Sequence, residues 1–253
     1  MLRFPRSHVT LVTGASLGIG AATAREFARR GSAVAVHYNS SEREALEVVR
    51  SVEAGSGVAA SFQADLSHVG ECRRLVRSVL GRFGRIDALV NNAGSLVDRR
   101  ALAAIDREFW GRVMDLNLAS VLWVTQAVAS DMRKRGAGAV INLGSIAGHN
   151  GGGPGAILYA TAKAGVTGMT KGLAKELIAD GIRVNAVNPG VILTPFHEQF
   201  SSADRMADMV AQIPQGRAGE SSEVAGVIAF LASEAASHVV GESIEVNGGM
   251  LMD

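Results

Sequence analysis

The chain has 253 residues, of which 47% are hydrophobic and 19% charged, enough apolar material for one large core. Its 25 lysine and arginine residues nearly balance 24 aspartate and glutamate residues, so no excess of positive charge favours nucleic acid or an anionic membrane as a partner. The single cysteine, Cys72, excludes an intrachain disulfide and a multi-thiolate zinc site. We therefore expect one soluble domain over residues 1–253.

The first residues of the chain predict no export signal. They lead directly into the apolar run His8–Val12, without the hydrophobic stretch of about 7–15 residues that a signal peptide needs. Later apolar segments such as Val224–Ala232 fall short of the roughly 20 residues that span a bilayer. We expect a cytoplasmic protein.

Short β-branched runs alternate with longer segments of helical period along the whole chain, which predicts a parallel sheet covered by crossover helices. The predicted strands are His8–Thr13, Ala33–Tyr38, Val58–Gln63, Ala88–Asn91, Ala139–Leu143, Arg183–Asn188 and Ser243–Val246. The predicted helices are Ile19–Arg30, Glu42–Ala54, Gly70–Arg82, Arg107–Arg135 with a break, Tyr159–Ala179 and Ser222–Ala232. The pattern is typical of a single α/β three-layer sandwich with a sheet of about seven strands.

Two glycine-rich stretches follow predicted strands. One is Gly148–Gly155, and the other begins at Pro189-Gly190 and continues as an irregular segment to Gly219. Ligands of open α/β sheets bind outside the carboxyl ends of the strands, so both loops are candidates for a site. We predict a substrate lid at about residues 192–216.

The loop after the first strand has the composition of a dinucleotide-binding loop, with the spacing G-x-x-x-G-x-G. Glycines let backbone N–H groups approach a pyrophosphate, and the following helix N-terminus adds partial positive charge and unpaired donors. Glycines also serve tight turns, so the position between strand and helix carries the prediction. The loop reads Thr13-Gly14-Ala15-Ser16-Leu17-Gly18-Ile19-Gly20.

Further motifs follow in a fixed order: Asn91-Asn92-Ala93-Gly94, Asn117, Ser145 and Tyr159-Ala160-Thr161-Ala162-Lys163. Together with the glycine loop they make the chain resemble the short-chain dehydrogenase/reductases from Thr13 to Gly249. Within that family it looks most like the bacterial 3-oxoacyl-acyl carrier protein reductases, including the segments Gln212–Arg217 and Val246–Met250. The resemblance implies a Rossmann-type fold and NAD(P)(H)-dependent hydride transfer between a nicotinamide and a carbonyl or secondary alcohol.

Four residues are the predicted catalytic set. Tyr159 exchanges the proton, and because free tyrosine has a pKa of about 10, a nearby cation must favour the phenolate. Lys163 lies one helical turn on, at i+4, where its ammonium, with the oxidised nicotinamide, should lower the pKa of Tyr159. The Ser145 hydroxyl can hold the substrate oxygen. By resemblance, Asn117 supports a water that relays protons through Lys163.

The resemblance also implies the cofactor contacts. They are Gly14, Ser16, Leu17, Gly18, Ile19 and Gly20 for the pyrophosphate, Tyr38, Asn39 and Ser40 at the end of the second strand, Asp65 and Leu66 for adenine, Ala93 and Gly94 beside the ribose, Pro189, Gly190, Ile192 and Thr194 at the carboxamide, and Tyr159 with Lys163. Asn91 is also a candidate, with a structural hydrogen-bonding role between strands as the alternative. The second strand ends at Tyr38-Asn39-Ser40-Ser41, without the acid that usually selects NAD(H). NADP(H) is therefore favoured, and NAD(H) stays open because no basic residue stands at Leu17 or near Asn39.

The six histidines show no i, i+4 pairing or carboxylate motif, so we expect surface or loop residues and no metal site. His149 and His197 fall in loops over the predicted site and are candidate substrate contacts. Ser145 and Tyr159 are 14 positions apart, one more than the family resemblance leads us to expect. We assign the extra residue to the glycines at 151–153.

Alternatives remain for the function. A sugar or polyol dehydrogenase would suit the polar segment Thr194–Gln199, and a non-catalytic dinucleotide-binding regulator would use the same fold. The substrate, the direction of the reaction and an acyl carrier protein as partner stay open.

The sequence also predicts a homotetramer. Leu116–Ala129 is apolar on more than one face, and small residues begin the next long helix at Ala160–Gly165. In related enzymes these helices form one dimer interface and about Ser222–Val246 a second, and two isologous interfaces generate a D₂ tetramer. The alternative is that Trp123 and its neighbours are simply core.

Overall fold

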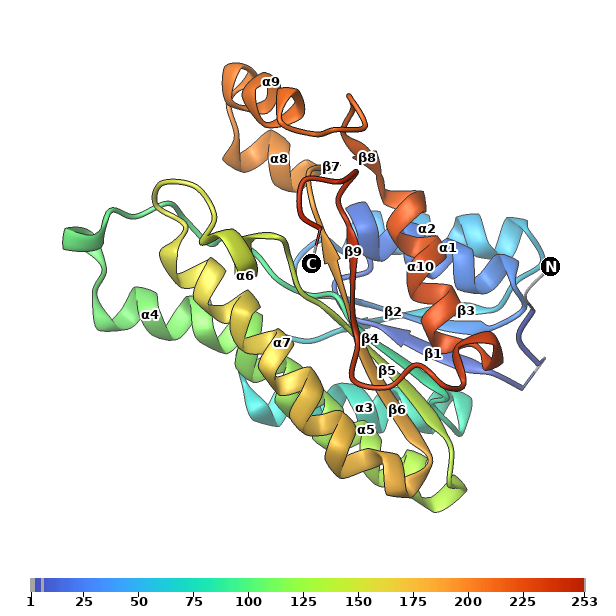
Figure 1. Cartoon of the computed structure of the whole chain (residues 1–253). Coiled ribbons are helices and arrows are strands. Elements are labelled where there is room, and N and C mark those ends of the chain that lie inside the picture. The colour runs from blue at the N-terminus through green and yellow to red at the C-terminus, as the bar shows by residue number, and fades with distance from the viewer. Residues whose placement is uncertain (1–2, 6, 253) are drawn as a thin grey trace.

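The computed structural model describes residues 3–5 and 7–252; Met1, Leu2, Arg6 and Asp253, and with them the two ends of the predicted domain, lie outside the described residues. Seven parallel strands form the main sheet in the order β3-β2-β1-β4-β5-β6-β9 (Figure 1). All seven predicted strands are confirmed. They are β1 (Val9–Val12), β2 (Ala33–Tyr38), β3 (Ala59–Gln63), β4 (Ala88–Asn91), β5 (Gly138–Leu143), β6 (Ile182–Pro189) and β9 (Ser243–Val246).

The strand order reverses direction between β1 and β4, which pair through Thr10 with Ala88 and Val12 with Val90. From β1 the chain proceeds outward to β3, and from β4 it proceeds outward on the other side to β9. Loops leaving β1 and β4 therefore diverge and open a crevice at the carboxyl edge of the sheet. The topology places the glycine loop and the segment after Asn91 at this crevice.

Helices cover both faces of the sheet, as three layers require. One core cluster joins the sheet to α1 (Gly18–Arg29), α2 (Glu42–Ala54) and α10 (Ser221–Ala232), with Phe27 and Ile228 fully buried. The other joins it to α3 (Val69–Phe83), α5 (Ser120–Arg135) and α7 (Ile157–Leu177), with Leu75 and Met132 fully buried. The predicted sandwich is confirmed.

The predicted break in Arg107–Arg135 is a change of helical pitch and not an interruption. α4 (Arg107–Met114) continues through a π-helical turn, η2 (Asp115–Ala119), directly into α5. The continuous helix is 29 residues long and, by length and composition alone, could cross a membrane, which the shorter apolar segments could not. In this fold α5 buries Val121, Val124 and Val128 against the sheet.

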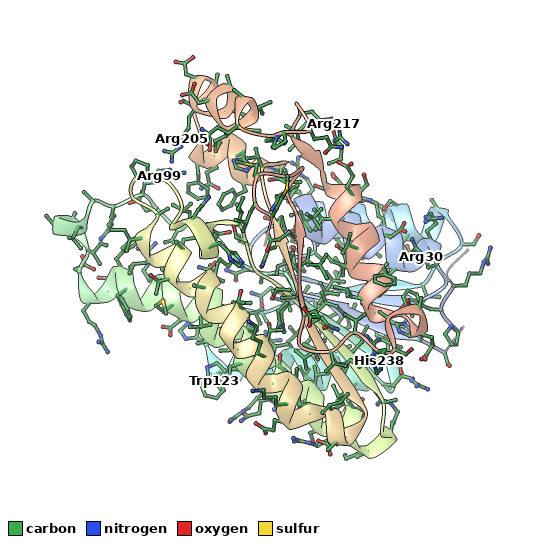
Figure 2. All side chains as sticks on the ribbon, in the orientation of Figure 1. Arg30, Arg99, Trp123, Arg205, Arg217 and His238 are labelled. Atoms are coloured by element: carbon green, nitrogen blue, oxygen red, sulfur yellow. The ribbon has the colours of Figure 1, made fainter. Side chains whose placement is uncertain are left out.

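The segment after β6 was predicted to be irregular, and that prediction is wrong. It contains β7 (Ile192–Leu193), α8 (Pro195–Phe200), α9 (Ala203–Ala211) and β8 (Gly219–Glu220), and β7 pairs in parallel with β8. Pro195 at the first turn starts α8, and the Ser202 side chain caps α9 by accepting from Arg205 N. Side chains of Arg205 and, from the loop after β4, Arg99 lie close to each other here (Figure 2).

The remaining short elements connect these layers: η1 (Leu102–Ala104), α6 (Ala147–Asn150), η3 (Ile178–Asp180) and η4 (Glu234–Ala236). α6 follows β5 directly and so lies at the crevice. Its four residues are followed by a second glycine-rich segment, residues 151–155, which was predicted to lie at the site.

Candidate active site

A cavity of about 930 Å³ lies at the carboxyl ends of the strands, lined by the glycine loop and by the 192–216 segment, whose Thr194 lies against Gly18. Most of the predicted site residues line it. They are Gly14, Ser16, Leu17, Gly18, Ile19, Gly20, Asn39, Ser40, Asp65, Leu66, Ala93, Gly94, Ser145, Tyr159, Lys163, Pro189, Gly190, Ile192, Thr194 and His197. The structure leaves four predicted residues out of the lining: Tyr38, Asn91, Asn117 and His149.

The glycine loop is shaped for a bound pyrophosphate. Gly14 has a φ of +60°, and a Cβ added at Gly20 would lie 2.2 Å from the Gly14 carbonyl oxygen, so neither position accepts a side chain without strain. Leu17 gives α1 no side-chain cap, and no acidic residue occupies its first turn. The first N–H groups of α1 are therefore available to an anion in the cavity, which fits a dinucleotide.

His37 holds the glycine loop, a role the sequence did not show. Its Nδ1 accepts from Gly14 N at 2.9 Å and its Nε2 donates to Ala64 O at 3.0 Å, which fixes the neutral tautomer. Burial lowers the pKa of His37 to about 4. The expectation of a surface or loop residue is thus wrong for His37. His8 precedes β1 outside regular structure, but its half-buried ring stacks on Phe4, and burial lowers its pKa to about 4. Long-range packing, not local sequence, buries His37.

Another part of the cavity lining suits the adenosine side of a dinucleotide. Asn39, Ser40 and Asp65 line it, whereas the Tyr38 hydroxyl turns away and donates to Glu42 at 3.1 Å. The Asp65 carboxylate accepts from the Ser67 hydroxyl and N–H, and the hydroxyl bond is the main cause of its lowered pKa. Tyr38 is therefore an unsuitable cofactor contact through its side chain.

The two asparagines after β4 have different tasks. Asn91 is buried and donates to Thr125 Oγ1 and Asn142 Oδ1, both at 2.9 Å, so its side chain joins strands and helices rather than lining the cavity. Asn92 donates to the carbonyl oxygens of Thr13 and Gly14, both at 2.9 Å. Asn92 was not predicted, although it lies beside Asn91 in the same motif.

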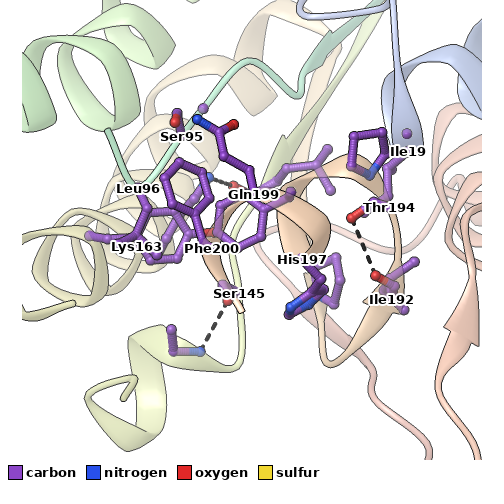
Figure 3. Close-up of a pocket in the computed structure, with 18 of the residues that line it drawn as sticks. Ile19, Ser95, Leu96, Ser145, Lys163, Ile192, Thr194, His197, Gln199 and Phe200 are labelled. Atoms are coloured by element: carbon purple, nitrogen blue, oxygen red, sulfur yellow. Dashed lines mark hydrogen bonds between the residues drawn. The ribbon is translucent and has the colours of Figure 1, made fainter. Parts of the chain in front are cut away.

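Ser145, Tyr159 and Lys163 meet at the other half of the cavity (Figure 3 shows Ser145 and Lys163). Lys163 is 4% exposed, donates to Leu143 O at 2.6 Å, and has its Nζ 5.7 Å from the centre of the Tyr159 ring. Burial lowers the pKa of Lys163 to about 8. At neutral pH the site therefore holds a buried ammonium ion beside the phenol.

Burial outweighs the predicted effect of Lys163 on the pKa of Tyr159, and the effect of the oxidised nicotinamide stays a prediction. Burial raises this pKa to about 12, and the opposing effect comes from a hydrogen bond with the Ser145 hydroxyl. The ammonium of Lys163 lies over the ring and binds a carbonyl oxygen, so it does not offset the desolvation of the phenolate. Tyr159 is thus protonated at neutral pH and ready to donate.

Asn117 supports the site from below. Its Oδ1 accepts from Ser95 N at 3.0 Å and its Nδ2 donates to Ser95 O and Val113 O, so both of its N–H donors are used by protein groups. A Cβ added at Gly94 would lie 2.8 Å from this Oδ1 and 3.4 Å from Lys163 Nζ. Asn117 thereby holds the loop after β4 close to Lys163. The water that Asn117 was predicted to support, as a proton relay through Lys163, stays a prediction.

The glycines to which the extra residue was assigned form a turn between α6 and α7. Gly151 and Gly152 have φ values of +80° and +71°, a conformation that glycine adopts without strain. Ser145 still reaches Tyr159 across this longer loop. A loop of glycines can therefore absorb one residue without separating the two hydroxyls.

The two candidate histidines lie in different places. His149 is outside the cavity lining, with its Nε2 3.1 Å from Asn188 Nδ2 and 3.4 Å from Glu245 Oε1, because α6 turns it toward β6 and β9. Substrate contact by His149 is therefore a prediction that this geometry does not favour. His197 lines the cavity on α8, next to Phe196, whose ring centre is 5.8 Å from that of Tyr159.

Comparison with known proteins agrees with this geometry. Residues 14–251 match the family model described as "Enoyl-(Acyl carrier protein) reductase". The 3-oxoacyl-[acyl-carrier-protein] reductase of Synechocystis sp. is 44% identical over 97% of this chain and 98% of its own length. The 3-oxoacyl-[acyl-carrier-protein] reductase FabG of Staphylococcus epidermidis is 41% identical over 96% of this chain and 98% of its own.

Two solved structures share the whole fold. The NADH-dependent reductase A1-R′ responsible for alginate metabolism superposes with a TM-score of 0.89 at 36% identity, covering 97% of this chain and 98% of that one. A blue fluorescent protein from a metagenomic library, in complex with NADPH, gives a TM-score of 0.90 at 35% identity and the same coverage.

The order of the parallel strands reverses next to the glycine loop, and a tyrosine and a lysine one helical turn apart line the same cavity. Together these features define an NAD(P)(H)-dependent oxidoreductase acting on a carbonyl or secondary alcohol. With a family model covering nearly the whole chain and relatives above 40% identity, the assignment narrows further. The chain belongs to the short-chain dehydrogenase/reductase family and is most similar to its 3-oxoacyl-acyl carrier protein reductases.

Proposed function

We propose that this protein reduces a ketone to a secondary alcohol with NADPH, and that Tyr159 donates the proton to the substrate oxygen. The observation that carries the proposal is that Ser145, Tyr159 and Lys163 lie together in the cavity that the glycine loop also lines. When bound, the reduced nicotinamide supplies the hydride. Ser145 orients the substrate oxygen, Lys163 keeps a positive charge beside the phenol, and the 192–216 segment covers the substrate as a lid.

The first substrate class to test is a 3-oxoacyl thioester, because two relatives carry that activity in their names. We expect NADPH-dependent reduction of S-acetoacetyl-N-acetylcysteamine, followed by the loss of NADPH absorbance. Sugars and polyols form the comparison set. Binding of NADPH without turnover on any carbonyl would instead support the regulator that the sequence left open.

The proposal includes NADP(H) as the preferred cofactor. Asn39, Ser40 and Ser41 line the cavity as neutral donors, and none of the three is an acid that would repel a 2′-phosphate at the end of β2. We expect a higher kcat/KM with NADPH than with NADH, and Asn39→Asp should lower the NADPH value at least about tenfold through repulsion while sparing NADH. A tenfold preference of the unaltered protein for NADH would overturn this choice.

We further propose a cytoplasmic homotetramer. The only cysteine is buried, with its pKa raised to about 11 by burial, and so needs no oxidising compartment. Two large apolar side chains stay about 40% exposed on helices predicted to associate, Ile157 on α7 (44%) and Phe230 on α10 (41%). β9 is the last strand of the sheet, and all its residues are half-buried.

Light scattering at micromolar concentration should report about four times the 26.3 kDa chain mass. Phe230→Lys should lower this mass toward the dimer by placing a charge in the second interface. Trp123, half-buried against the core on α5, is less informative because packing within one chain already accounts for it. A monomer for the unaltered protein would contradict the tetramer.

A further inference from the structure

Two arginines from opposite walls of the cavity meet at the loop between α6 and α7. Arg99, from the segment after β4, donates through Nε to Phe200 O at 3.0 Å and through Nη1 to Pro154 O at 2.9 Å. Arg205, on α9, has its Nη2 1.9 Å from where a Cβ on Gly153 would stand. Both arginines line the cavity and lie near each other (Figure 2), close enough for the charge of Arg205 to lower the pKa of Arg99.

No carboxylate neutralises this pair among the side chains that the structure describes. Neither arginine takes part in any of its ion pairs, and Asp208, which also lines the cavity, is not bonded to either. Burial, and then Arg205, lower the pKa of Arg99. Burial, followed by the charges of Arg99 and Arg205, lowers the pKa of His197. Two half-buried cations that repel each other are stabilised by an anion between them.

The pair lies at the reacting end of the cavity. The ring of Phe196 is 5.8 Å from that of Tyr159 and 5.1 Å from that of Phe200, whose carbonyl oxygen accepts from Arg99. Asn39 and Ser40, which line the predicted adenosine end, follow β2, whereas Arg99 follows β4, and these two strands lie on opposite sides of β1. An anion held by the arginines would therefore belong to the substrate and not to the cofactor's ribose.

The loop and the arginine fit each other. Gly153 belongs to the glycine turn to which the sequence assigned one extra residue, and a side chain there would make the guanidinium of Arg205 shift from its place. Leu96, Phe196 and Phe200 supply an apolar wall for a short carbon chain beside the charged pair.

We propose that Arg99 and Arg205 form an anion-binding subsite for the substrate, which is a carbonyl compound carrying a carboxylate or a phosphate a few carbons from the ketone. The inference rests on the proposed function, because the bound anion places the ketone at Tyr159. Arginine binds both anions through paired, charge-assisted hydrogen bonds, and losing such a contact should lower kcat/KM about 10- to 100-fold. The alternative is that the pair only clamps the 192–216 segment to the loop.

The test compares charged and neutral members of matched pairs under NADPH. One arm uses 4-oxopentanoate, 5-oxohexanoate and their methyl esters, and the other uses dihydroxyacetone phosphate and dihydroxyacetone. The neutral S-acetoacetyl-N-acetylcysteamine monitors the reductase itself. Arg205→Gln removes the charge from the arginine whose side chain makes no hydrogen bond to the described residues, and Arg205→Lys restores a charge. Arg112→Gln, on the exposed face of α4, is the matched control.

We expect the unaltered protein to prefer an anion over its neutral partner at least about tenfold in kcat/KM, in one arm or the other, which identifies the anion. Arg205→Gln should abolish that preference while changing the neutral thioester by less than twofold, Arg205→Lys should restore part of it, and Arg112→Gln should keep it. Equal use of charged and neutral partners, or equal losses on both in Arg205→Gln, would show a structural clamp and overturn the inference. Failure to reduce any carbonyl would instead contradict the proposed function, and this inference with it.

Discussion

Tyr159→Phe should reduce kcat about 10²- to 10⁴-fold while leaving the fold and cofactor affinity nearly unchanged. The substitution removes only the hydroxyl, which the structure holds in its protonated form with a pKa of about 12 and hydrogen-bonds to Ser145. The ring itself stays to pack against Phe196. Steady-state kinetics with NADPH, together with fluorescence titration of the cofactor, would measure the two quantities separately.

The chain offers a matched control because it has only one other tyrosine, Tyr38. Tyr38→Phe also removes a hydroxyl that makes a hydrogen bond, here to Glu42, but it lies outside the cavity lining and should keep most of the activity. If Tyr159→Phe retained more than about a tenth of kcat, the lost transition-state stabilisation would be under ~1.4 kcal/mol and the proton-transfer role would be wrong.

Lys163→Met should lose more than about 90% of kcat/KM and weaken cofactor binding, without destabilising the fold in proportion. The substitution removes the buried ammonium beside Tyr159 but keeps an unbranched side chain of similar length. Lys171→Met, on the exposed side of the same helix, is the control for a lost lysine charge. Activity and cofactor titration would be followed as for Tyr159.

The direction in which Lys163→Met changes the free energy of unfolding can be predicted. Because burial lowers the pKa of Lys163 from 10.5 to about 8, the folded protein binds fewer protons than the unfolded chain between these values. Stability therefore rises with pH through that window, and below pH 8 the full burial penalty of about 3 kcal/mol is present. Methionine removes this penalty but leaves Leu143 O without its donor, at a cost of roughly 1–3 kcal/mol.

Urea unfolding at pH 7 should accordingly give Lys163→Met a free energy of unfolding equal to that of the unaltered protein or up to about 2 kcal/mol higher. The same measurement on the unaltered protein should show stability increasing from pH 8 toward pH 10. A variant that is both much less stable and still active would contradict the place given to this lysine.

The sequence by itself determined most of the fold. Strands buried on both faces read as apolar β-branched runs, so all seven were found, and amphipathic helices such as Glu42–Ala54 were found with their ends. The glycine loop and the Ser145, Tyr159 and Lys163 set were also recognisable, because their backbone conformation and chemistry allow few substitutes in that order. These signals are local, and local signals can be read along a chain.

Only the tertiary structure decided what depends on packing between distant segments. His37 became a buried acceptor for Gly14 because β1 and β2 are neighbours, and His149 was turned onto Glu245 from β9. Burial raises the pKa of Tyr159, whose ring lies 5.8 Å from that of Phe196 on α8, in a segment predicted to be irregular. Arg99 and Arg205 stand 106 positions apart in the chain and come together only because α9 folds over the loop at Gly153. Desolvation and through-space charge depend on such neighbours, and no local pattern encodes them.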